Sequence, residues 1–321
     1  MKNIYSNIYK PNNFNIKKAK KYLENNKVIG LPTETVYGLA ANAYSNKSVK
    51  KIYNLKKRPA INPIIIHYWN LKILKKDVVI NNNFLKLYKA FCPGPITFIL
   101  NKKLRSKISP IATAKKKTIA VRFPKHKVAR KLLSILKLPL AAPSANMSSK
   151  LSPTSSTDVV DEFKKKIKFI LDGGRSKIGL ESTIIDLTSR VKILRPGYIT
   201  QEKIEKILKK KIKISKKVKK IISPGQLKKH YYPGIPVTLN MKIPKKDEAV
   251  VGFGRRFKNR KNYFNLSKNG NLNEAANNLY KTLREIKNKG FKTIIVNKIP
   301  NTGIGIAIND RLKRASAKWI K

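Results

Sequence analysis

The 321-residue sequence contains one cysteine, three histidines and only 16 acidic residues. Cys92 alone cannot form an intramolecular disulfide, which is typical of a reducing compartment. One Cys and three scattered His also exclude a Cys/His zinc cluster. No stretch approaches the roughly 20 apolar residues of a membrane span, and the N-terminal sequence lacks the apolar segment of a secretion signal. We therefore expect a soluble, cytoplasmic protein with no membrane contact and no redox cofactor.

Several well-known nucleotide and hydrolase motifs are also missing. The chain has no G-x-x-x-x-G-K-[ST] loop, which excludes ATP binding of the P-loop kind, and no G-x-S-x-G nucleophile elbow. The segment "GFGRRF" at 252–257 begins like a dinucleotide-binding loop but lacks its third glycine. Any nucleotide site must therefore be built in another way.

What the sequence has in excess is positive charge. Lys and Arg number 73, giving a formal net charge of +57, and because Arg occurs 13 times the remaining 60 are Lys. Clustered cations neutralise phosphates, so the charge favours a nucleic-acid partner. Lys, Asn and Ile are also the residues that an AT-rich coding sequence produces by drift. Both explanations stay open, and the few Arg residues are the more informative cations.

Helical and strand patterns alternate without a strict βαβ repeat. Ile16, Ala19 and Leu23 have helical spacing, whereas short Ile- and Val-rich runs between Gly and Pro residues predict strands. We expect a buried strand and loop at 28–40, helices at 14–27, 48–59, 82–91, 125–137 and 199–214, and strand-rich segments at 62–68, 92–100, 118–124, 138–146, 168–174, 179–189 and 191–197. This pattern predicts a twisted, mixed α/β sheet with helices packed on it.

A change in composition divides the chain into three predicted parts. We expect a first domain over 1–208, an ordered linker over 209–240 and a smaller α/β domain over 241–321. The linker carries His230 and Tyr231 between turn-forming Pro and Gly residues. In the last part, the predicted order is a strand at 248–254, a helix at 273–290, a strand at 291–300 and a helix at 303–320.

The first domain contains three groups of polar residues beside predicted strands. In "KKRPAINPIIIH", Lys56 and Arg58 end a helix and His67 ends a strand. Two cations at a Pro-terminated helix can grip a polyphosphate, or they can simply complement the helix dipole. The other groups are "APSANMSSKLSPTS" at 142–155 and "GLESTIID" at 179–186 with Arg195 of "LRPG". Each alone is as typical of a loop or a capping residue as of a site.

Taken together, these groups resemble the YrdC/Sua5 family, the threonylcarbamoyl-AMP synthases. The resemblance is carried by "LPTETVYGLAANA", "KKRPAINPIIIH", "PGPITFIL", "VRFP", "APSANMS" with "SPT", "GLESTIID" and "ILRPG", in this order. The segments "SPGQLKKHYYPGIPV" and "GIGIAINDRLKRAS" resemble the linker and additional domain of the longer Sua5 type. The resemblance covers nearly the whole chain and implies a YrdC-like catalytic domain followed by a Rossmann-like C-terminal domain.

This resemblance implies an enzyme, a nucleotidyltransferase, that condenses L-threonine, bicarbonate and ATP into threonylcarbamoyl-AMP and releases pyrophosphate. Mg²⁺ is expected to accompany the ATP. A partner tRNA threonylcarbamoyl transferase would then modify the adenosine beside the anticodon of ANN-decoding tRNAs, and weak tRNA or RNA binding would accompany this role.

The resemblance also implies roles for individual residues. The expected catalytic tetrad is Lys56, Arg58, Ser144 and Asn146. The expected ATP-binding residues are Lys56, Arg58, Asn62, Thr118, Ser144, Ser152 and Arg195. The expected threonine-binding residues are Thr35, His67, Arg122, Ala142 and Ser182. His230 and Tyr231 match an HY-x-P element that acts as a lid, and no metal ligand is assigned.

Two residues depart from the family pattern, and two other functions compete. Ala142 stands where relatives carry Thr or Ser, which removes a side-chain contact, and Ser149 replaces a Gly, which predicts a different backbone conformation. A non-catalytic RNA-binding protein of the same fold is the main alternative, although RNA affinity would not require the polar pocket residues. The related carbamoyl-handling domain of hydrogenase maturation proteins is disfavoured, because its zinc-finger cysteines are absent.

Overall fold

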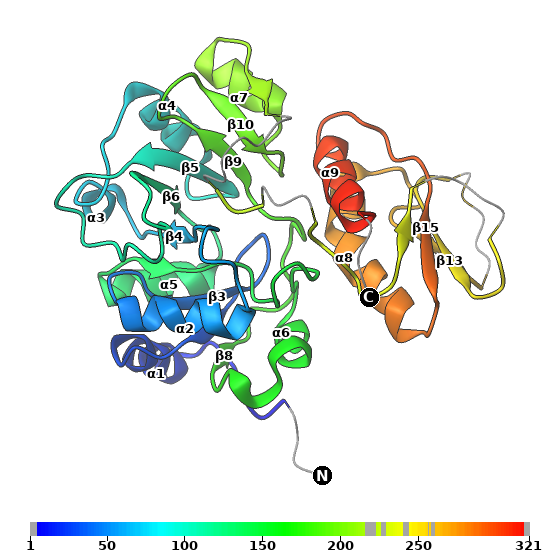
Figure 1. The fold of residues 1–321 in the computed structure, drawn as a ribbon, viewed down its shortest axis with the longest axis horizontal. Coiled ribbons are helices and arrows are strands. Elements are labelled where there is room, and N and C mark those ends of the chain that lie inside the picture. The colour runs from blue at the N-terminus through cyan, green and yellow to red at the C-terminus, as the bar shows by residue number, and fades with distance from the viewer. Residues whose placement is uncertain are drawn as a thin grey trace.

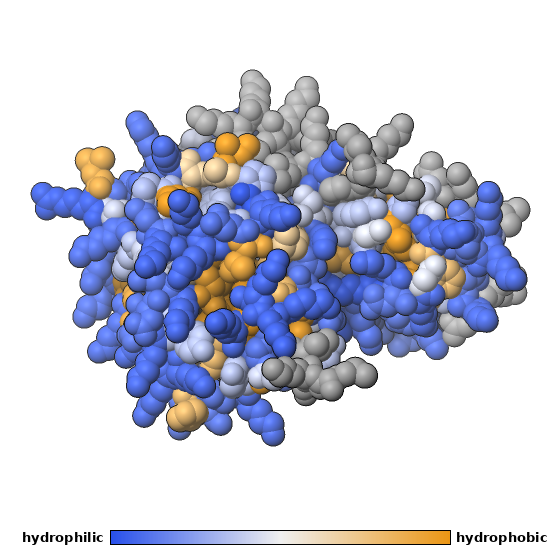
Figure 2. Space-filling view, turned by 60° about the horizontal axis from the view of Figure 1, so that its bottom comes forward, coloured by the Kyte–Doolittle hydropathy of each residue, from blue (hydrophilic) through white to orange (hydrophobic). Residues whose placement is uncertain are grey.

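The structure is a computed structural model that describes residues 5–215, 223–225, 229–239, 244–255, 257 and 261–317. It comprises two α/β domains, with α8 (Leu272–Asn288) and α9 (Gly305–Ala315) of the second domain on the side that faces the first (Figure 1). No helix in the described ranges is long and apolar enough to cross a membrane. Hydrophilic side chains cover most of the face seen in Figure 2, as the high Lys content requires.

The first domain is built on a mixed sheet. Its strands are β1 (Ile8–Tyr9), β2 (Ile29–Leu31), β3 (Gly38–Asn42), β4 (Ile65–His67), β5 (Ile96–Asn101), β6 (Thr118–Arg122), β7 (Leu140–Ala141), β8 (Ile170–Leu171), β9 (Thr183–Asp186), β10 (Lys192–Arg195) and β11 (Lys213–Ile214). Their spatial order is β1-β8-β2-β3-β7-β4-β6-β5-β9-β10-β11. Because β4 pairs parallel to β6 but antiparallel to β7, the sheet is mixed, as predicted.

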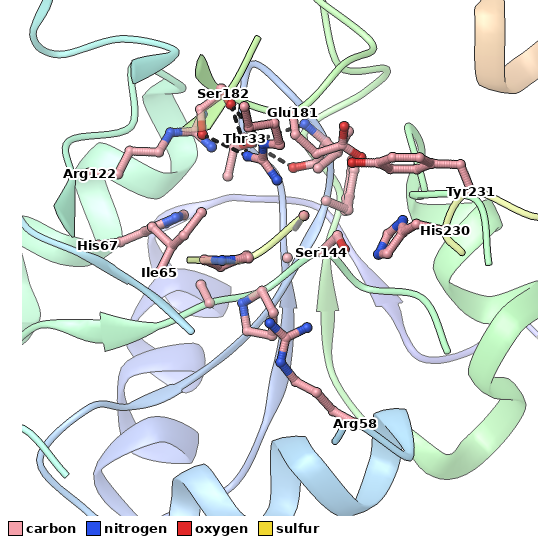
Figure 3. A pocket seen from close by; sticks show the side chains of 18 residues that line it. Thr33, Arg58, Ile65, His67, Arg122, Ser144, Glu181, Ser182, His230 and Tyr231 are labelled. Atoms are coloured by element: carbon pink, nitrogen blue, oxygen red, sulfur yellow. Dashed lines mark hydrogen bonds between the residues drawn. The ribbon is translucent and has the colours of Figure 1, made fainter. Parts of the chain in front are cut away.

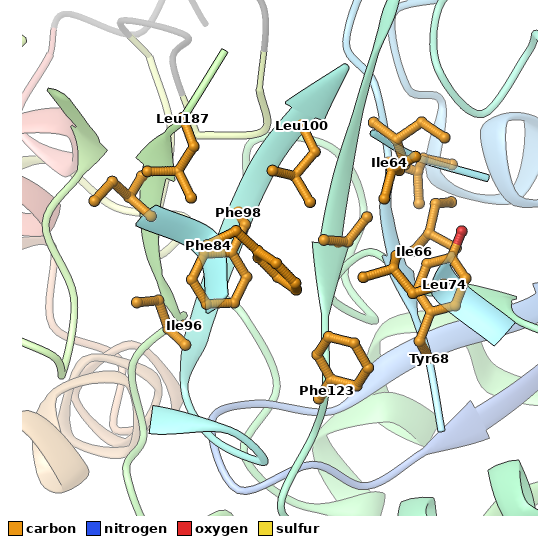
Figure 4. Close-up of a cluster of buried hydrophobic side chains, with 14 of the residues drawn as sticks. Ile64, Ile66, Tyr68, Leu74, Phe84, Ile96, Phe98, Leu100, Phe123 and Leu187 are labelled. Carbon is orange, nitrogen blue, oxygen red and sulfur yellow. The ribbon is translucent and has the colours of Figure 1, made fainter. Parts of the chain in front are cut away.

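Helices cover both faces of this sheet. They are α1 (Asn13–Glu24), α2 (Asn46–Lys56), α3 (Leu71–Leu74), α4 (Asn82–Phe91), α5 (Lys127–Leu136), α6 (Ser156–Phe163) and α7 (Gln201–Leu208), with a 3₁₀ turn at Lys164–Lys166. The apolar faces of α1 and α5 pack on each other and on β2, whereas α2, α4 and α7 share a second cluster with β4, β5 and β6. In that cluster, the rings of Phe84 and Phe98 meet edge to face at 5.0 Å (Figure 4).

Three local predictions need correction. The stretch 28–40 forms two antiparallel strands, β2 and β3, around a polar loop. The segment 199–214 is not one helix, because α7 ends at Leu208 and β11 follows it. Helix α6 was not predicted; it begins with a capping box in which Ser155 and Asp158 satisfy each other's backbone N–H groups.

The second domain is a small parallel sheet covered by two helices. Strands β12 (Val237–Thr238), β13 (Glu248–Gly252), β14 (Tyr263–Asn265) and β15 (Thr293–Val296) are arranged in the order β12-β15-β13-β14. The helices are α8 (Leu272–Asn288) and α9 (Gly305–Ala315). The predicted strands and helices of this domain are confirmed, and β12 and β14 are additional.

The two domains share a continuous apolar core. The buried cluster of the second domain, which includes Leu279 and Tyr280 of α8, also contains Val36, Leu151 and Leu180 of the first. Polar contacts flank it, because Arg284 of α8 donates to the backbone oxygens of residues 151 and 152 at 3.0 and 2.7 Å. The second domain is therefore docked on the first through buried contacts.

Candidate active site

One pocket lies where the ends of several first-domain strands meet the linker (Figure 3). Its described lining residues are Thr33, Val36, Tyr37, Gly38, Arg58, Ile65, His67, Arg122, Ala142, Pro143, Ser144, Glu181, Ser182, Arg195, Pro224, Gly225, His230 and Tyr231. The lining thus combines three arginines with hydroxyl groups and small apolar side chains.

The end of α2 sets the position of Arg58. Lys57 takes a left-handed conformation (φ 49°), and the N–H of Arg58 donates to the carbonyl of Tyr53 at 2.9 Å, which ends the helix. The guanidinium donates to the backbone oxygens of Asn62 and Pro63 at 2.9 and 2.7 Å. Burial lowers the pKa of Arg58 to about 10, so it is cationic at neutral pH.

Lys56 lies behind the pocket wall. Its side chain is 1% exposed and its ammonium donates to the backbone oxygens of Ser144 and Asn146. Burial, and then the charge of Arg58, lowers its pKa well below the usual value. The position of Lys56 indicates that it fixes the loop carrying Ser144 against α2.

His67 and Arg122 are register neighbours at the ends of β4 and β6. Both are buried, and among the described residues neither the Nε of Arg122 nor the Nδ1 of His67 has a hydrogen-bond partner. Burial, and then Arg122, lowers the pKa of His67 well below its usual value, so the imidazole is neutral. Arg122 also donates from Nη2 to Glu34 at 2.7 Å. These two strand ends therefore place a cation and a neutral imidazole in the pocket.

The threonines of the loop after β2 are arranged as a pair. Their hydroxyl oxygens lie 2.8 Å apart, and Thr33 also donates to the carbonyl of Val36 at 2.6 Å. Thr33 lines the pocket, whereas Thr35 is fully buried behind it. Thr35 therefore supports the hydroxyl that faces the cavity.

Ser182 and Arg195 form another part of the pocket wall. The guanidinium of Arg195 donates to the carbonyl of Ser182 at 3.1 and 2.9 Å and to its hydroxyl at 3.2 Å. The Ser182 hydroxyl also lies 2.7 Å from that of Thr97. Burial lowers the pKa of Arg195 from its usual value. Within the described chain, neither Arg195 nor Arg58 has a carboxylate within 4.0 Å, so both cations are available to an anion.

Glu181 is the one carboxylate among the described lining residues. It accepts hydrogen bonds from the hydroxyls of Ser152 and Tyr280 and from Nε of Arg311. Burial alone would raise the pKa of Glu181, but Arg311, Arg195 and the Ser152 hydrogen bond outweigh it and lower the pKa to about 2. Glu181 is therefore an ionised carboxylate whose contacts come largely from the second domain.

The linker covers the pocket with His230 and Tyr231. Their rings meet edge to face at 4.1 Å, and the buried Tyr231 hydroxyl has no hydrogen-bond partner within the described ranges. Burial lowers the pKa of His230 to about 3 and raises that of Tyr231 to about 12, so both are neutral. Gly225 packs so closely on Arg195 that a Cβ would lie 2.6 Å from its Cδ. The described part of the linker is thus in contact with the wall that carries Arg195.

Ser149 connects the lid to the first domain. Its carbonyl accepts from the N–H of Tyr232 at 2.8 Å. Ser149 has φ 72°, the left-handed conformation that glycine adopts without strain. A serine in this conformation carries backbone strain. The expected difference from the backbone of relatives stays a prediction.

Two family models match the chain. The model Sua5_yciO_yrdC, described as "Telomere recombination", matches residues 21–197, and the model for the C-terminal domain of threonylcarbamoyl-AMP synthase matches residues 199–317. The chain belongs to the Sua5/YrdC family. The resemblance drawn from the motifs is thereby confirmed.

Individual relatives match along nearly the whole chain. Threonylcarbamoyl-AMP synthase of Pyrococcus abyssi is 37% identical over 94% of this chain and 94% of its own length. The Bacillus subtilis protein of the same name is 36% identical over 94% and 92%. The crystal structure of P. abyssi Sua5 complexed with L-threonine superposes with a TM-score of 0.88 at 34% identity, covering 96% of this chain and 97% of that one. The predicted two-domain α/β fold is confirmed.

Among the described lining residues are most of the side chains assigned from the family motifs. These are Arg58, His67, Arg122, Ala142, Ser144, Ser182, Arg195, His230 and Tyr231. Five others do not line the pocket but take part in hydrogen bonds with a lining residue or within the loop that carries Ser144. These are Lys56, Asn62, Thr35, Asn146 and Ser152. Thr118 does not line the pocket, because it begins β6 and Arg122 ends it, which separates them by about 13 Å.

Sequence reasoning missed Thr33 and Glu181, which both line the pocket, and Arg311, which holds Glu181. Thr33 lies two residues before the predicted Thr35 in "LPTETVYG", and Glu181 directly precedes the predicted Ser182 in "GLESTIID". Thr33 lines the pocket where the predicted Thr35 does not, whereas Glu181 lines it together with the predicted Ser182. Arg311 had no local signal, because its partner is 130 residues away.

Proposed function

We propose that this protein is an L-threonylcarbamoyladenylate synthase, a nucleotidyltransferase that forms threonylcarbamoyl-AMP and pyrophosphate from L-threonine, bicarbonate and ATP. The observation that carries the proposal is the convergence of Arg58, Arg122 and Arg195 on one pocket beneath the His230–Tyr231 lid. The end-to-end match to synthases and to a threonine complex supports it.

The two unpaired arginines suit the triphosphate of ATP. Arg58 and Arg195 reach the cavity from opposite elements, the end of α2 and the end of β10. Guanidinium groups bind phosphate oxygens through paired hydrogen bonds. We assign Arg58 and Arg195, with Ser144 beside them in the lining, to the nucleotide. Lys56 and Asn146 act in this assignment by holding the Ser144 loop.

The β4–β6 end of the pocket suits the amino acid. Arg122 keeps an unpaired Nε, which can donate to the threonine carboxylate. The neutral His67 and the Ser182 hydroxyl can bond the amine or side-chain hydroxyl. Ile65 and Ala142 line the same cavity and offer apolar contact to the substrate methyl group. The pocket therefore has complementary groups for each part of threonine.

The chemistry requires positioning more than covalent help. The threonine amine adds to bicarbonate to give a carbamate and water. A carbamate oxygen then attacks the α-phosphorus, and the bond between that phosphorus and the bridging oxygen of the β-phosphate breaks, releasing pyrophosphate. Arg58 and Arg195 would neutralise the charge on the departing pyrophosphate. The lid would exclude water from a product that hydrolyses readily.

Mg²⁺ is proposed to enter with the nucleotide. In the described residues no group of three His, Cys, Asp or Glu side chains could hold a metal ion, and Glu181 is already bonded to Ser152, Tyr280 and Arg311. Because the described side chains offer no such group of ligands, the pocket suits a metal ion that is coordinated by phosphate oxygens and water. Mg²⁺ is commonly bound in this way. Bound there, Mg²⁺ would supply charge neutralisation for the leaving group.

We place this activity in the cytoplasm, where a partner transferase would move the threonylcarbamoyl group to ANN-decoding tRNAs. The testing experiment is pyrophosphate release by the nucleotide-free protein, with and without L-threonine and bicarbonate. Release that needs both co-substrates is the expected result. Absence of release, together with tight salt-sensitive tRNA binding, would reject the synthase in favour of an RNA-binding protein.

A further inference from the structure

The carboxylate of Glu181 is held mainly by the second domain. Arg311 of α9 donates from Nε at 3.0 Å, and the Tyr280 hydroxyl of α8 lies 3.1 and 3.0 Å from the two oxygens. From the first domain, the Ser152 hydroxyl donates to the same carboxylate. Arg311 is 1% exposed, and its Nη1 also donates to the carbonyl of Pro196 at 2.8 Å. A residue of one domain thus completes a pocket wall of the other.

Glu181 has a second cation within its electrostatic reach. Arg195 hydrogen-bonds the backbone of Ser182, the next residue after Glu181, and its charge helps to keep Glu181 ionised. No ion pair shorter than 4.0 Å joins Arg195 to Glu181 among the described residues. A buried carboxylate seeks a charged partner, because an unpaired charge is costly in a low-dielectric interior. Apart from Arg311, Arg195 is the arginine whose charge acts on Glu181.

Arg311 also reaches the lid. Its guanidinium lies 5.4 Å from the ring centre of Tyr231, and that ring stacks on Tyr280 at 5.8 Å. Both residues that hold Glu181 from the second domain therefore also contact the lid tyrosine. Arg311 and Tyr280 thus contact the first domain, orient Glu181 and pack against the lid tyrosine at the same time.

We propose that Arg311, assisted by Tyr280, is a positioning residue that engages Glu181 and so leaves Arg195 free to bind the anionic phosphates of the substrate. This inference rests on the proposed function, because that proposal assigns Arg195 to ATP. It gives the second domain a role in the reaction through the charge arrangement of the pocket. Removing Arg311 lets Glu181 capture Arg195, which withdraws a phosphate-binding cation.

The test compares single and double variants in the full-length chain. Arg311→Gln is expected to weaken Mg²⁺–ATP binding, measured by calorimetry without threonine, roughly tenfold or more. Adding Glu181→Gln removes the charge that captures Arg195, so the double variant is expected to recover most of the lost affinity. Lys313→Gln removes one cation from the exposed side of the same helix and is expected to bind ATP like the wild type.

A purely structural role would give a different pattern. Thermal unfolding of each variant separates lost stability from lost affinity, and a double variant with no better ATP binding than Arg311→Gln would overturn the proposal. If Arg311→Gln does not fold, Tyr280→Phe removes one hydroxyl from Glu181 while keeping the ring. It is expected to weaken ATP binding about threefold, and unchanged binding would reject the inference.

The outcomes separate this inference from the proposed function. If the wild type releases pyrophosphate with both co-substrates but Arg311→Gln binds ATP normally, the inference fails and the synthase stands. If the wild type releases none yet binds ATP in an Arg311-dependent and Glu181-reversible way, the inference stands without the activity. Absence of ATP binding by the wild type would overturn both.

Discussion

Glu34 and Arg122 form a buried ion pair that joins the loop after β2 to the end of β6. Nη2 of Arg122 lies 2.7 Å from Oε1 of Glu34, and the second carboxylate oxygen accepts from the N–H of Lys125 at 3.0 Å. Both side chains are less than 10% exposed. The Nη2 edge of the guanidinium is thereby fixed, while its Nε has no hydrogen-bond partner in the part of the chain that the structure describes.

The first prediction concerns this pair. Glu34→Gln removes the countercharge of a buried arginine, so the unfolding free energy is expected to fall by about 3 kcal/mol. The KM for threonine is expected to rise roughly tenfold with little change in kcat, since Arg122 loses its orientation. Urea unfolding and steady-state kinetics check both effects. Glu24→Gln breaks an exposed pair with Lys20 and should change neither, whereas equal effects of the two variants would contradict this role.

The second prediction concerns Arg58. Arg58→Ala is expected to lower threonine-dependent pyrophosphate release by at least two orders of magnitude, because a phosphate-binding cation is lost. The protein should stay folded, since its two backbone hydrogen bonds are worth about 1–3 kcal/mol in total. Arg105→Ala removes an exposed arginine elsewhere in the same domain and serves as the control. Near-normal turnover by Arg58→Ala would remove Arg58 from the catalytic assignment.

The sequence predicted the fold well where local patterns decide it. Helix α4 was expected at 82–91 and is found at Asn82–Phe91, because Asn81 caps it and apolar residues repeat along one face. The β2–β3 hairpin was missed, since a polar loop and short strands leave no clear alternation. Short pairings such as β11 with β10 depend on a neighbour distant in sequence, and no local pattern reports that neighbour.

The same distinction applies to the pocket. Arginine proved the informative cation: Arg58, Arg122 and Arg195 all line the cavity, in a chain where Lys is far more abundant. They could be identified because each stands in a motif that resembles the family, and their roles stay predictions. The contact between Glu181 and Arg311 could not, since it depends on how two domains dock. The sequence can show which residue types could bind a substrate, whereas the contacts between distant residues follow only from the tertiary structure.

The third prediction is a pH dependence that arises from the lid. In the folded protein burial lowers the pKa of His230 to about 3, against about 6.5 when exposed. Between these values the unfolded chain binds a proton that the folded chain does not, so the unfolding free energy falls as the pH falls and is fully retained above 6.5. The charged groups that act on His230 are Glu181, Lys56, Arg58 and Arg195.

His230→Asn should remove this contribution. Urea unfolding between pH 6.5 and 4.5 is expected to show a slope up to about 1.4 kcal/mol per pH unit smaller than in the wild type. This range ends at the ordinary pKa of a glutamate, 4.5, so nearly all of the contribution of Glu181, whose pKa is lowered to about 2, is retained. Parallel curves for the two proteins would show that His230 does not titrate on unfolding in this way.

The last prediction concerns the domain interface at Gly179. Gly179 has φ +74°, and a Cβ there would lie 2.7 Å from the Cα and carbonyl oxygen of Asn277 in α8. Gly179→Ala therefore combines backbone strain with a collision against the second domain. It is expected to loosen docking, increase proteolysis of the linker and weaken ATP binding through the displaced Arg311.

Gly174 supplies the matched control for this variant. It has nearly the same conformation, φ +71°, but nothing lies within 4 Å of the place that a Cβ would take there. Gly174→Ala should thus show only the backbone cost of about 1 kcal/mol and keep wild-type ATP affinity and linker protection. Because the two variants share the strain and differ in the collision, any difference in ATP affinity measures the effect of docking on the pocket. Identical affinities would mean that α8 can shift away from Gly179 without altering the site.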